Sequence, residues 1–229
     1  MTTMVASFYV HRPEDHPDAA DYPRMLRLLD ASCRRFGLSH VVLTDHATVP
    51  MLTGLYCFAT DLPRNVLQAT TESHARWMES NCFRGMDTVF VGADSLVLKD
   101  FRPFLKPADL SIIYFVHKRL WILNGFIHVP ASSREKATPL FREVADDTQP
   151  LEMRTCDDMM AWERALEPRP APPHFGLAQR RGLTVNFLEE KIWNLRLLSL
   201  DHPVGGAVML HFRGPPQKAM MFDWAARHP

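Results

Sequence analysis

The sequence has few cysteines, and none of them are closely spaced. The four cysteines among its 229 residues are Cys33, Cys57, Cys82 and Cys156, and they contain no C-x-x-C pair. This spacing argues against a zinc knuckle. Because widely spaced, sparse cysteines are typical of proteins in reducing compartments, we expect a reduced, cytoplasmic protein.

An excess of one charge and long apolar runs are also missing. The 26 lysines and arginines balance 26 aspartates and glutamates, so the net charge indicates neither a nucleic-acid nor a membrane partner. A local basic face is still compatible with a total of zero. No apolar run approaches the roughly 20 residues of a membrane span. The N-terminus lacks the basic start and apolar core of a signal peptide, so we expect no membrane association.

Strand-like and helix-like patterns alternate over the first hundred residues. Runs rich in β-branched and aromatic residues indicate strands, and an apolar stripe with an N-cap at its start indicates a helix. This order predicts an α/β protein with a mainly parallel sheet. We expect strands over residues 4–10, 40–45 and 56–60 and within 87–100, and helices over residues 21–37 and 64–80.

Carboxylates follow two of these predicted strands. In parallel α/β sheets ligands bind outside the carboxyl ends of the strands, where Asp45, Asp94 and the loop after Val10 would lie. Asp94 stands in Gly92-Ala93-Asp94, between two apolar runs, where a carboxylate is costly unless a partner satisfies it. A divalent metal would do so. The alternative is an aspartate that closes a turn through backbone hydrogen bonds.

The second half departs from the alternating pattern. Strand-like runs at 109–116 and 120–129 are separated by only three residues, which favours an antiparallel or mixed extension of the sheet. Asn124-Gly125 lies inside the second run, where a glycine marks a bulge or the close approach of a ligand. Asp157 and Asp158 open a helix, and capping is an alternative role for at least one of them. We further expect helices over 133–144 and 157–166, a strand over 207–212 and a final helix to about 226.

Four segments occur in an order that resembles a known enzyme family. Gly92-Ala93-Asp94 resembles an Asp-x-Asp metal motif whose first aspartate is replaced by glycine. Asn124-Gly125 is similar to an Asn-(Ala)-Gly strand, and Asp157-Asp158 to a Gly-Asp-Gln helix start. His211-Phe-Arg-Gly214 with Lys218 resembles a His-Phe-x-Gly-x-x-Lys segment, with the lysine one position later. Together, across about residues 4–218, they resemble the family-8-like, compact bacterial or phage glycosyltransferases of the GT-A fold.

The resemblance implies a fold and a reaction. The fold would be a single GT-A domain over residues 1–229, with a Rossmann-like, mixed but mainly parallel sheet flanked by helices. Residues 1–100 would bind the nucleotide, and residues 101–229 the sugar and the acceptor. The reaction would be metal-dependent transfer of a sugar from a nucleotide diphosphate, with a UDP-sugar as the expected donor, to an acceptor hydroxyl. The resembled enzymes retain the anomeric configuration.

The resemblance also implies roles for individual residues. Transfer leaves negative charge on the diphosphate, which a divalent metal and cationic side chains stabilise. Asp94 and His211 would hold the metal, and the histidine favours Mn²⁺ over Mg²⁺; a purely structural His211 is the alternative. Asp158, or less favourably Asp157, would touch the sugar hydroxyls or act as the base on the acceptor. The other expected donor-binding residues are Ser7, Tyr9 and Asp45 for base and ribose, Asn124 and Gly125 for the sugar, and Arg76, Arg213, Gly214 and Lys218 for the phosphates.

Two other functions stay open. Gly92 in place of an aspartate lowers the expected metal affinity unless the metal arrives with the nucleotide, and it keeps open a sugar-nucleotide-binding protein without activity. A sugar-phosphate nucleotidyltransferase would share the fold class. A chain that resembled such enzymes would have a glycine-rich loop after the first strand. Residues 11–17 contain no glycine, so we rank this function lower.

The sequence carries little information about the acceptor. A soluble saccharide, a protein, or a hydroxymethylated pyrimidine in phage DNA all stay open, and the last would place the protein in the cytoplasm of a bacterial host. A duplex DNA acceptor needs a basic rim and extrusion of the base, although the neutral total favours dispersed, solvated charges. The sequence carries no signal for the oligomeric state. The residues available for a basic rim are Arg102, Lys106, Lys118, Arg119, Arg180 and Arg181.

Overall fold

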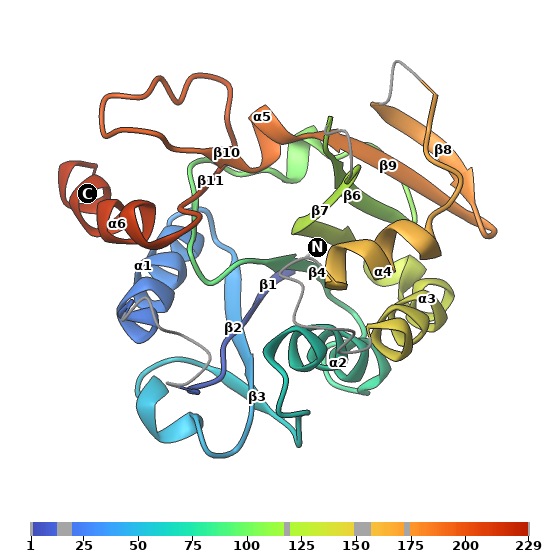
Figure 1. Ribbon diagram of the computed structural model, residues 1–229, viewed down its shortest axis with the longest axis horizontal. Coiled ribbons are helices and arrows are strands. Elements are labelled where there is room, and N and C mark those ends of the chain that lie inside the picture. Colours follow the sequence, from blue (N-terminus) through green and yellow to red (C-terminus); the bar gives the residue numbers. More distant parts are fainter. Residues whose placement is uncertain (1, 13–19, 117–119, 149–156, 172–174, 229) are drawn as a thin grey trace.

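The computed structural model describes residues 2–12, 20–116, 120–148, 157–171 and 175–228. Eight strands form one mixed sheet in the order β3-β2-β1-β4-β7-β6-β9-β8 (Figure 1). Six of them run in one direction, while β7 and β8 are antiparallel to their neighbours. The strands are β1 (Thr3–Phe8), β2 (Ser39–Thr44), β3 (Cys57–Ala59), β4 (Asp87–Val91), β6 (Leu110–Tyr114), β7 (Ile122–Val129), β8 (Gly176–Arg180) and β9 (Leu183–Glu189).

Helices cover both faces of this sheet (Figure 1). Successive side chains of β1 point to opposite faces of the sheet, and both faces are apolar. Met4 and Ala6 belong to the apolar cluster that includes residues of α2, α3 and α4, whereas Val5 between them belongs to the cluster that includes residues of α1. Within the described residues, no helix is long and apolar enough to cross a membrane. The helices are α1 (Tyr22–Arg34), α2 (Val66–Glu79), α3 (Arg134–Asp147), α4 (Asp157–Ala165), α5 (Glu190–Trp193) and α6 (Pro215–Arg227), with short 3₁₀ turns η2 (Val49–Leu52), η3 (Arg102–Phe104) and η4 (Ala131–Ser133).

A second, smaller sheet joins the C-terminal region to the segment after β4. It consists of β10 (Leu195–Arg196), β11 (Met209–His211) and β5 (Ser95–Val97). β11 pairs antiparallel with β5, and this register sets His211 opposite Ser95. The backbone N–H of Phe212 also donates to the Asp94 carbonyl at 2.8 Å. Residues more than a hundred positions apart are therefore locked together at the carboxyl end of β4.

The predicted fold class is confirmed, and most predicted elements are present. The expected strands correspond to β1, β2, β3, β4, β6, β7 and β11, and the expected helices to α1, α2, α3, α4 and α6. The connection expected between the strands at 109–116 and 120–129, residues 117–119, lies outside the described residues. β6 and β7 do pair antiparallel, as their short separation predicts.

The sequence reasoning missed the hairpin of β8 and β9. Its turn is Arg181-Gly182, and both residues have positive φ values, 49° and 78°. A two-residue turn with two positive φ values matches the right-handed twist of the flanking strands. Asparagine or aspartate usually precedes the glycine in such turns, and an arginine there concealed the signal. β9 continues the sheet beyond β6 and leads directly into α5, which borders the cavity described next.

Candidate active site

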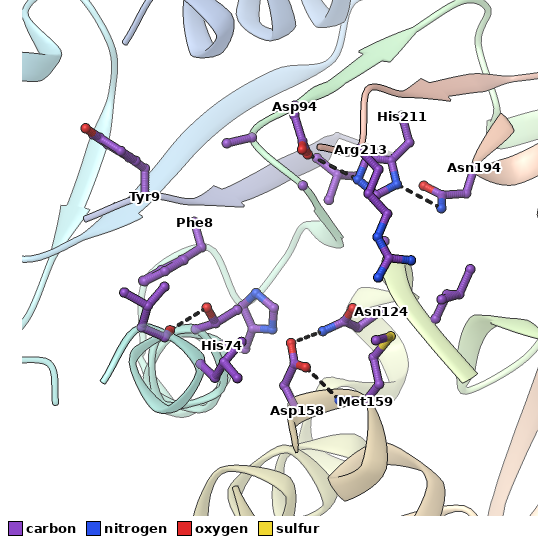
Figure 2. A pocket seen from close by; sticks show the side chains of 18 of the residues that line it. Phe8, Tyr9, His74, Asp94, Asn124, Asp158, Met159, Asn194, His211 and Arg213 are labelled. Atoms are coloured by element: carbon purple, nitrogen blue, oxygen red, sulfur yellow. Dashed lines mark hydrogen bonds and ion pairs between the residues drawn. The ribbon is translucent and has the colours of Figure 1, made fainter. Parts of the chain in front are cut away.

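A cavity of about 580 Å³ opens at the carboxyl ends of β1 and β4 and beside the start of β7. Its volume lies in the range usual for small-ligand sites. Eight of the residues predicted from the sequence line it, and Figure 2 shows several of them converging from different elements. These eight are Tyr9, Asp94, Asn124, Gly125, Asp158, His211, Arg213 and Lys218.

Asp94 and His211 form a pair in this cavity. The Nε2 atom of His211 lies 3.2 Å from Oδ1 of Asp94 (Figure 2). Burial alone would raise the pKa of Asp94, but the neighbouring His211 and Lys218 outweigh it and hold that pKa below its usual value. The carboxylate is therefore in its charged form at neutral pH, as a metal ligand must be.

Gly92 lies beside this pair. A Cβ atom placed on Gly92 would lie 2.7 Å from Oδ1 of Asp94 and 3.8 Å from Nε2 of His211. A side chain at position 92 would therefore displace the Asp94 carboxylate from its place beside His211. Among the described residues, no cluster of three or more His, Cys, Asp or Glu side chains could hold a metal. The pair therefore fits a divalent cation only if a bound ligand contributes the remaining oxygens.

Asn194 stands behind His211. Its Nδ2 atom lies 3.1 Å from Nδ1 of the histidine (Figure 2), and the side chain is almost fully buried. On its other side is Gly125 of β7, where an added Cβ would come within 2.7 Å of Oδ1 of Asn194. That Oδ1 atom is buried and has no hydrogen-bond partner among the described residues.

Asp158 and Asn124 meet on the opposite wall of the cavity. Nδ2 of Asn124 donates to Oδ2 of Asp158 at 2.6 Å, and the Met159 backbone N–H donates to Oδ1 at 2.8 Å (Figure 2). The backbone bond joins neighbouring residues in the first turn of α4. Burial raises the pKa of Asp158 despite both hydrogen bonds, and the neighbouring Asp157 adds to the rise. Asp158 is thus a buried carboxyl group that binds a proton more readily than an exposed one.

His74 and Glu190 are among the cavity residues that were not predicted from the sequence. His74 is 5% exposed on the face of α2 that also presents Thr70, one turn earlier. Burial lowers the pKa of His74 to about 3, so its ring is neutral at physiological pH. Burial raises the pKa of Glu190, against the opposing effect of His211, Arg213 and other cations. The i, i+4 spacing of Thr70 and His74 was the available sequence signal for the first of them.

Aromatic rings and a lysine form the end of the cavity near α1. The rings of Tyr9 and Tyr22 stack with centroids 5.1 Å apart and planes inclined by 21°. Nζ of Lys218 lies 4.7 Å from the centroid of the Tyr22 ring and donates to its hydroxyl. This end therefore combines flat apolar faces with a positive charge.

Ser7 and Asp45 lie near this end but do not line the cavity as the described residues form it. The Ser7 hydroxyl bonds to Nε2 of His40 at 2.9 Å beneath the surface. Asp45 accepts from the Thr48 backbone at 2.9 Å and lies 3.4 Å from Nη2 of Arg12. Their side chains are therefore engaged in contacts at the ends of β1 and β2.

Three further predicted residues also lie off the cavity as described. Arg76 is on an exposed face of α2, where its Nε donates to Glu72 at 2.7 Å. Gly214 has a φ of 87° and precedes the first turn of α6, so it orients Arg213 and Lys218 rather than contacting the cavity. Asp157 begins α4 beside Asp158. The structure thus separates the predicted residues into a converging group and a supporting group.

The described members of the predicted basic rim do not gather at the cavity. Arg102 is paired with Asp100 at 2.8 Å, and Arg181 with Glu143. Lys106 lines a separate groove. Lys118 and Arg119 lie outside the described residues.

Comparison with known proteins adds the fold. No family model and no curated protein sequence matches the chain. Solved structures do match. A glycosyltransferase involved in the glycosylation of the major capsid of PBCV-1 is 12% identical, with 97% of this chain and 100% of that chain covered and a TM-score of 0.63. The galactosyltransferase LgtC is 10% identical, with 98% and 96% covered and a TM-score of 0.52. Mouse xyloside xylosyltransferase 1 is 10% identical, with 93% and 98% covered and a TM-score of 0.52. The chain therefore has the GT-A glycosyltransferase fold over nearly its whole length.

Proposed function

We propose that the chain is a glycosyltransferase that moves a sugar from a nucleotide diphosphate, with UDP as the expected nucleotide, to an acceptor hydroxyl. The observation that carries this proposal is the pairing of Asp94 with His211, at 3.2 Å, in the same cavity as Arg213 and Lys218. A carboxylate, an imidazole and two cations at one end of a cavity suit a diphosphate with its metal.

The donor diphosphate occupies the end of the cavity near α6. Asp94 and His211 hold the cation, for which Mn²⁺ is the expected ion because one ligand is nitrogen. When bound, the cation stabilises the negative charge that develops on the leaving diphosphate. Lys218 and Arg213 contribute positive charge to the same oxygens. Because Asp94 and His211 are the two candidate ligands among the described residues, a bound diphosphate would have to supply further oxygens, so we expect the ion and the nucleotide to bind together.

The nucleobase and the sugar occupy opposite ends of the cavity. The stacked rings of Tyr9 and Tyr22 provide a flat apolar surface for the base. Asn124 and Asp158 border the sugar and accept or donate hydrogen bonds to its hydroxyls. In this assignment residues up to about 100 bind the nucleotide, and the later residues bind the sugar and the acceptor.

The acceptor hydroxyl needs a base and an approach to the sugar. In this proposal Asp158 takes the hydroxyl proton as a general base, and the hydrogen bond from Asn124 orients its carboxyl group. A soluble saccharide is the expected acceptor. Hydroxymethylated pyrimidine in duplex DNA is the second acceptor to test, because the cavity alone does not distinguish the two; the dispersed arginines favour the saccharide.

Turnover of a panel of nucleotide sugars with Mn²⁺ tests this function. We expect release of the nucleoside diphosphate with at least one donor. Asp94→Asn should lower the rate by about 10²–10³-fold, as expected for loss of a group that stabilises developing charge. Asp100→Asn is the matched control, because Asp100 is partly exposed, lies off the cavity and is paired with Arg102. Nucleotide binding without turnover of any donor would show a binding protein instead, and equal rates for both variants would refute the metal site.

A further inference from the structure

The buried amide of Asn194 controls the ring of His211 from behind. Asn194 is 2% exposed, and its position is fixed by the backbone bond from its N–H to the Glu190 carbonyl at 2.8 Å. Its side chain fills the space between His211 and Gly125, as the 3.1 Å contact to Nδ1 and the 2.7 Å approach to a Cβ at position 125 show. Any side chain at position 125 would displace this amide.

The direction of one hydrogen bond determines which ring nitrogen of His211 can bind a cation. With Nδ2 of Asn194 donating to Nδ1, the ring proton is on Nε2, which then donates to Asp94 at 3.2 Å. A protonated Nε2 has no lone pair for a cation. Ligation through Nε2 requires the proton on Nδ1, and that N–H then needs an acceptor.

Asn194 supplies this acceptor if its amide turns by half a rotation. The oxygen and the NH₂ group of an amide are close in size, so the rotated amide fits the same space between His211 and Gly125. The present state leaves Oδ1 unpaired among the described residues, and the rotated state leaves Nδ2 in that place. Each state thus has one unpaired amide atom, so the amide itself imposes only a small preference. Without a cation, the bond from Nε2 to Asp94 favours the present state, and a cation at Nε2 takes the place of that bond and selects the rotated state.

We propose that Asn194 is a positioning residue that reverses its hydrogen bond to His211 when the cation binds, and that Gly125 is required to leave room for its amide. The inference rests on the proposed function, since it assumes a cation between Asp94 and His211. It gives Gly125 a role different from contact with the sugar. In metal sites, loss of such an outer partner commonly lowers metal affinity by about 10–100-fold.

Binding of Mn²⁺ in the presence of UDP, followed by electron paramagnetic resonance of the free ion, tests the inference. Asn194→Ala should weaken Mn²⁺ binding by about 10–100-fold. Asn194→Asp should keep wild-type affinity or exceed it, because either carboxylate oxygen accepts from Nδ1. Asn186→Ala is the matched control: Asn186 is also 2% exposed, but it lies on β9 away from the cavity lining, and Mn²⁺ affinity should be unchanged.

A second measurement uses the wild type alone, with ¹⁵N-labelled histidine observed by NMR. The ¹⁵N shifts of the His211 ring should show the proton on Nε2 without ligands and on Nδ1 with Mg²⁺ and UDP. Mg²⁺ replaces Mn²⁺ in this experiment because it is diamagnetic. A proton on Nδ1 in both states, or wild-type affinity in Asn194→Ala, would overturn the inference while leaving the proposed function intact. If the wild type binds neither Mn²⁺ nor UDP, the proposed function fails and the inference fails with it.

Discussion

Replacing Gly125 by alanine should destabilise the protein through a single contact. The added methyl would lie 2.7 Å from Oδ1, 3.0 Å from Cγ and 3.0 Å from Nδ2 of Asn194, all closer than carbon atoms normally approach. Asn194 cannot retreat easily, because it is 2% exposed and lies against His211 on its far side. Overpacking of this kind costs about 1–3 kcal/mol. We therefore expect Gly125→Ala to lower the free energy of unfolding by about that amount.

A double-mutant cycle with Asn194→Ala isolates the contact. Asn194→Ala alone loses one hydrogen bond, at about 0.5–1.5 kcal/mol, but it also removes a buried carbonyl that has no partner among the described residues. In the double variant the methyl at position 125 occupies the space that the amide leaves. The double variant should thus be about as stable as Asn194→Ala, which corresponds to a coupling of about 1–3 kcal/mol between the two sites.

Urea unfolding of the four proteins measures this coupling directly. Gly205→Ala is the control, because no described atom lies within 4 Å of a Cβ there and its φ is not positive. That change should stay within about 0.5 kcal/mol of the wild type. Additive effects of the two substitutions, or a Gly125→Ala variant as stable as Gly205→Ala, would refute the proposed packing of Asn194 against Gly125.

Three further predictions concern single residues. Relative to Asp158→Asn, the wild type should lose stability as the pH rises through the raised pKa of Asp158, because burial favours its protonated form. The measurement is the urea midpoint of both proteins between pH 4 and pH 8. A difference in midpoint that does not change with pH would contradict this prediction. Arg76→Ala should leave UDP affinity, measured by calorimetry, unchanged and alter stability by about 0.3–0.5 kcal/mol at most, since Arg76 pairs with Glu72 on the helix surface. Weaker UDP binding would instead indicate that Arg76 contacts the phosphates. Arg134→Met should cost about 3–6 kcal/mol in urea unfolding, because the buried guanidinium donates to three carbonyls at the end of α2, of which the two nearer ones contribute about 1.5–3 kcal/mol each. A loss no larger than that of Arg142→Met at the surface would contradict this.

The fold could be predicted because its elements carry strong local patterns. β1 and β4 are short apolar runs bounded by polar residues, and α1 begins with the Asp21 N-cap followed by a proline, as expected for a helix start. The pairing of Asp94 with His211 could also be anticipated, but from the order of the motifs and not from local pattern. The strands that bring them together, β5 and β11, have only three residues each, too few to show a period.

The residues that the sequence did not reveal act through tertiary contacts. Asn194 follows the four-residue helix α5, and nothing near it in sequence indicates that it lies behind His211. Glu190 reaches the cavity because the unpredicted strand β9 carries it there. Conversely, Ser7 occupies a predicted strand, but its side chain points to His40 instead of the cavity. Which face of a strand a side chain occupies depends on register, which local sequence leaves undetermined.

The two glycines at this end of the cavity have connected consequences. Gly92 leaves Asp94 and His211 as the proposed protein ligands among the described residues, because glycine has no carboxylate to add. With two ligands, a larger share of the affinity for the cation depends on the Nε2 lone pair of His211. That lone pair is available only when Nδ1 of His211 donates its proton to Asn194. Gly125 makes room for the amide that forms this bond. A site reduced at position 92 therefore gains more from the support of Asn194 than a site with three ligands would.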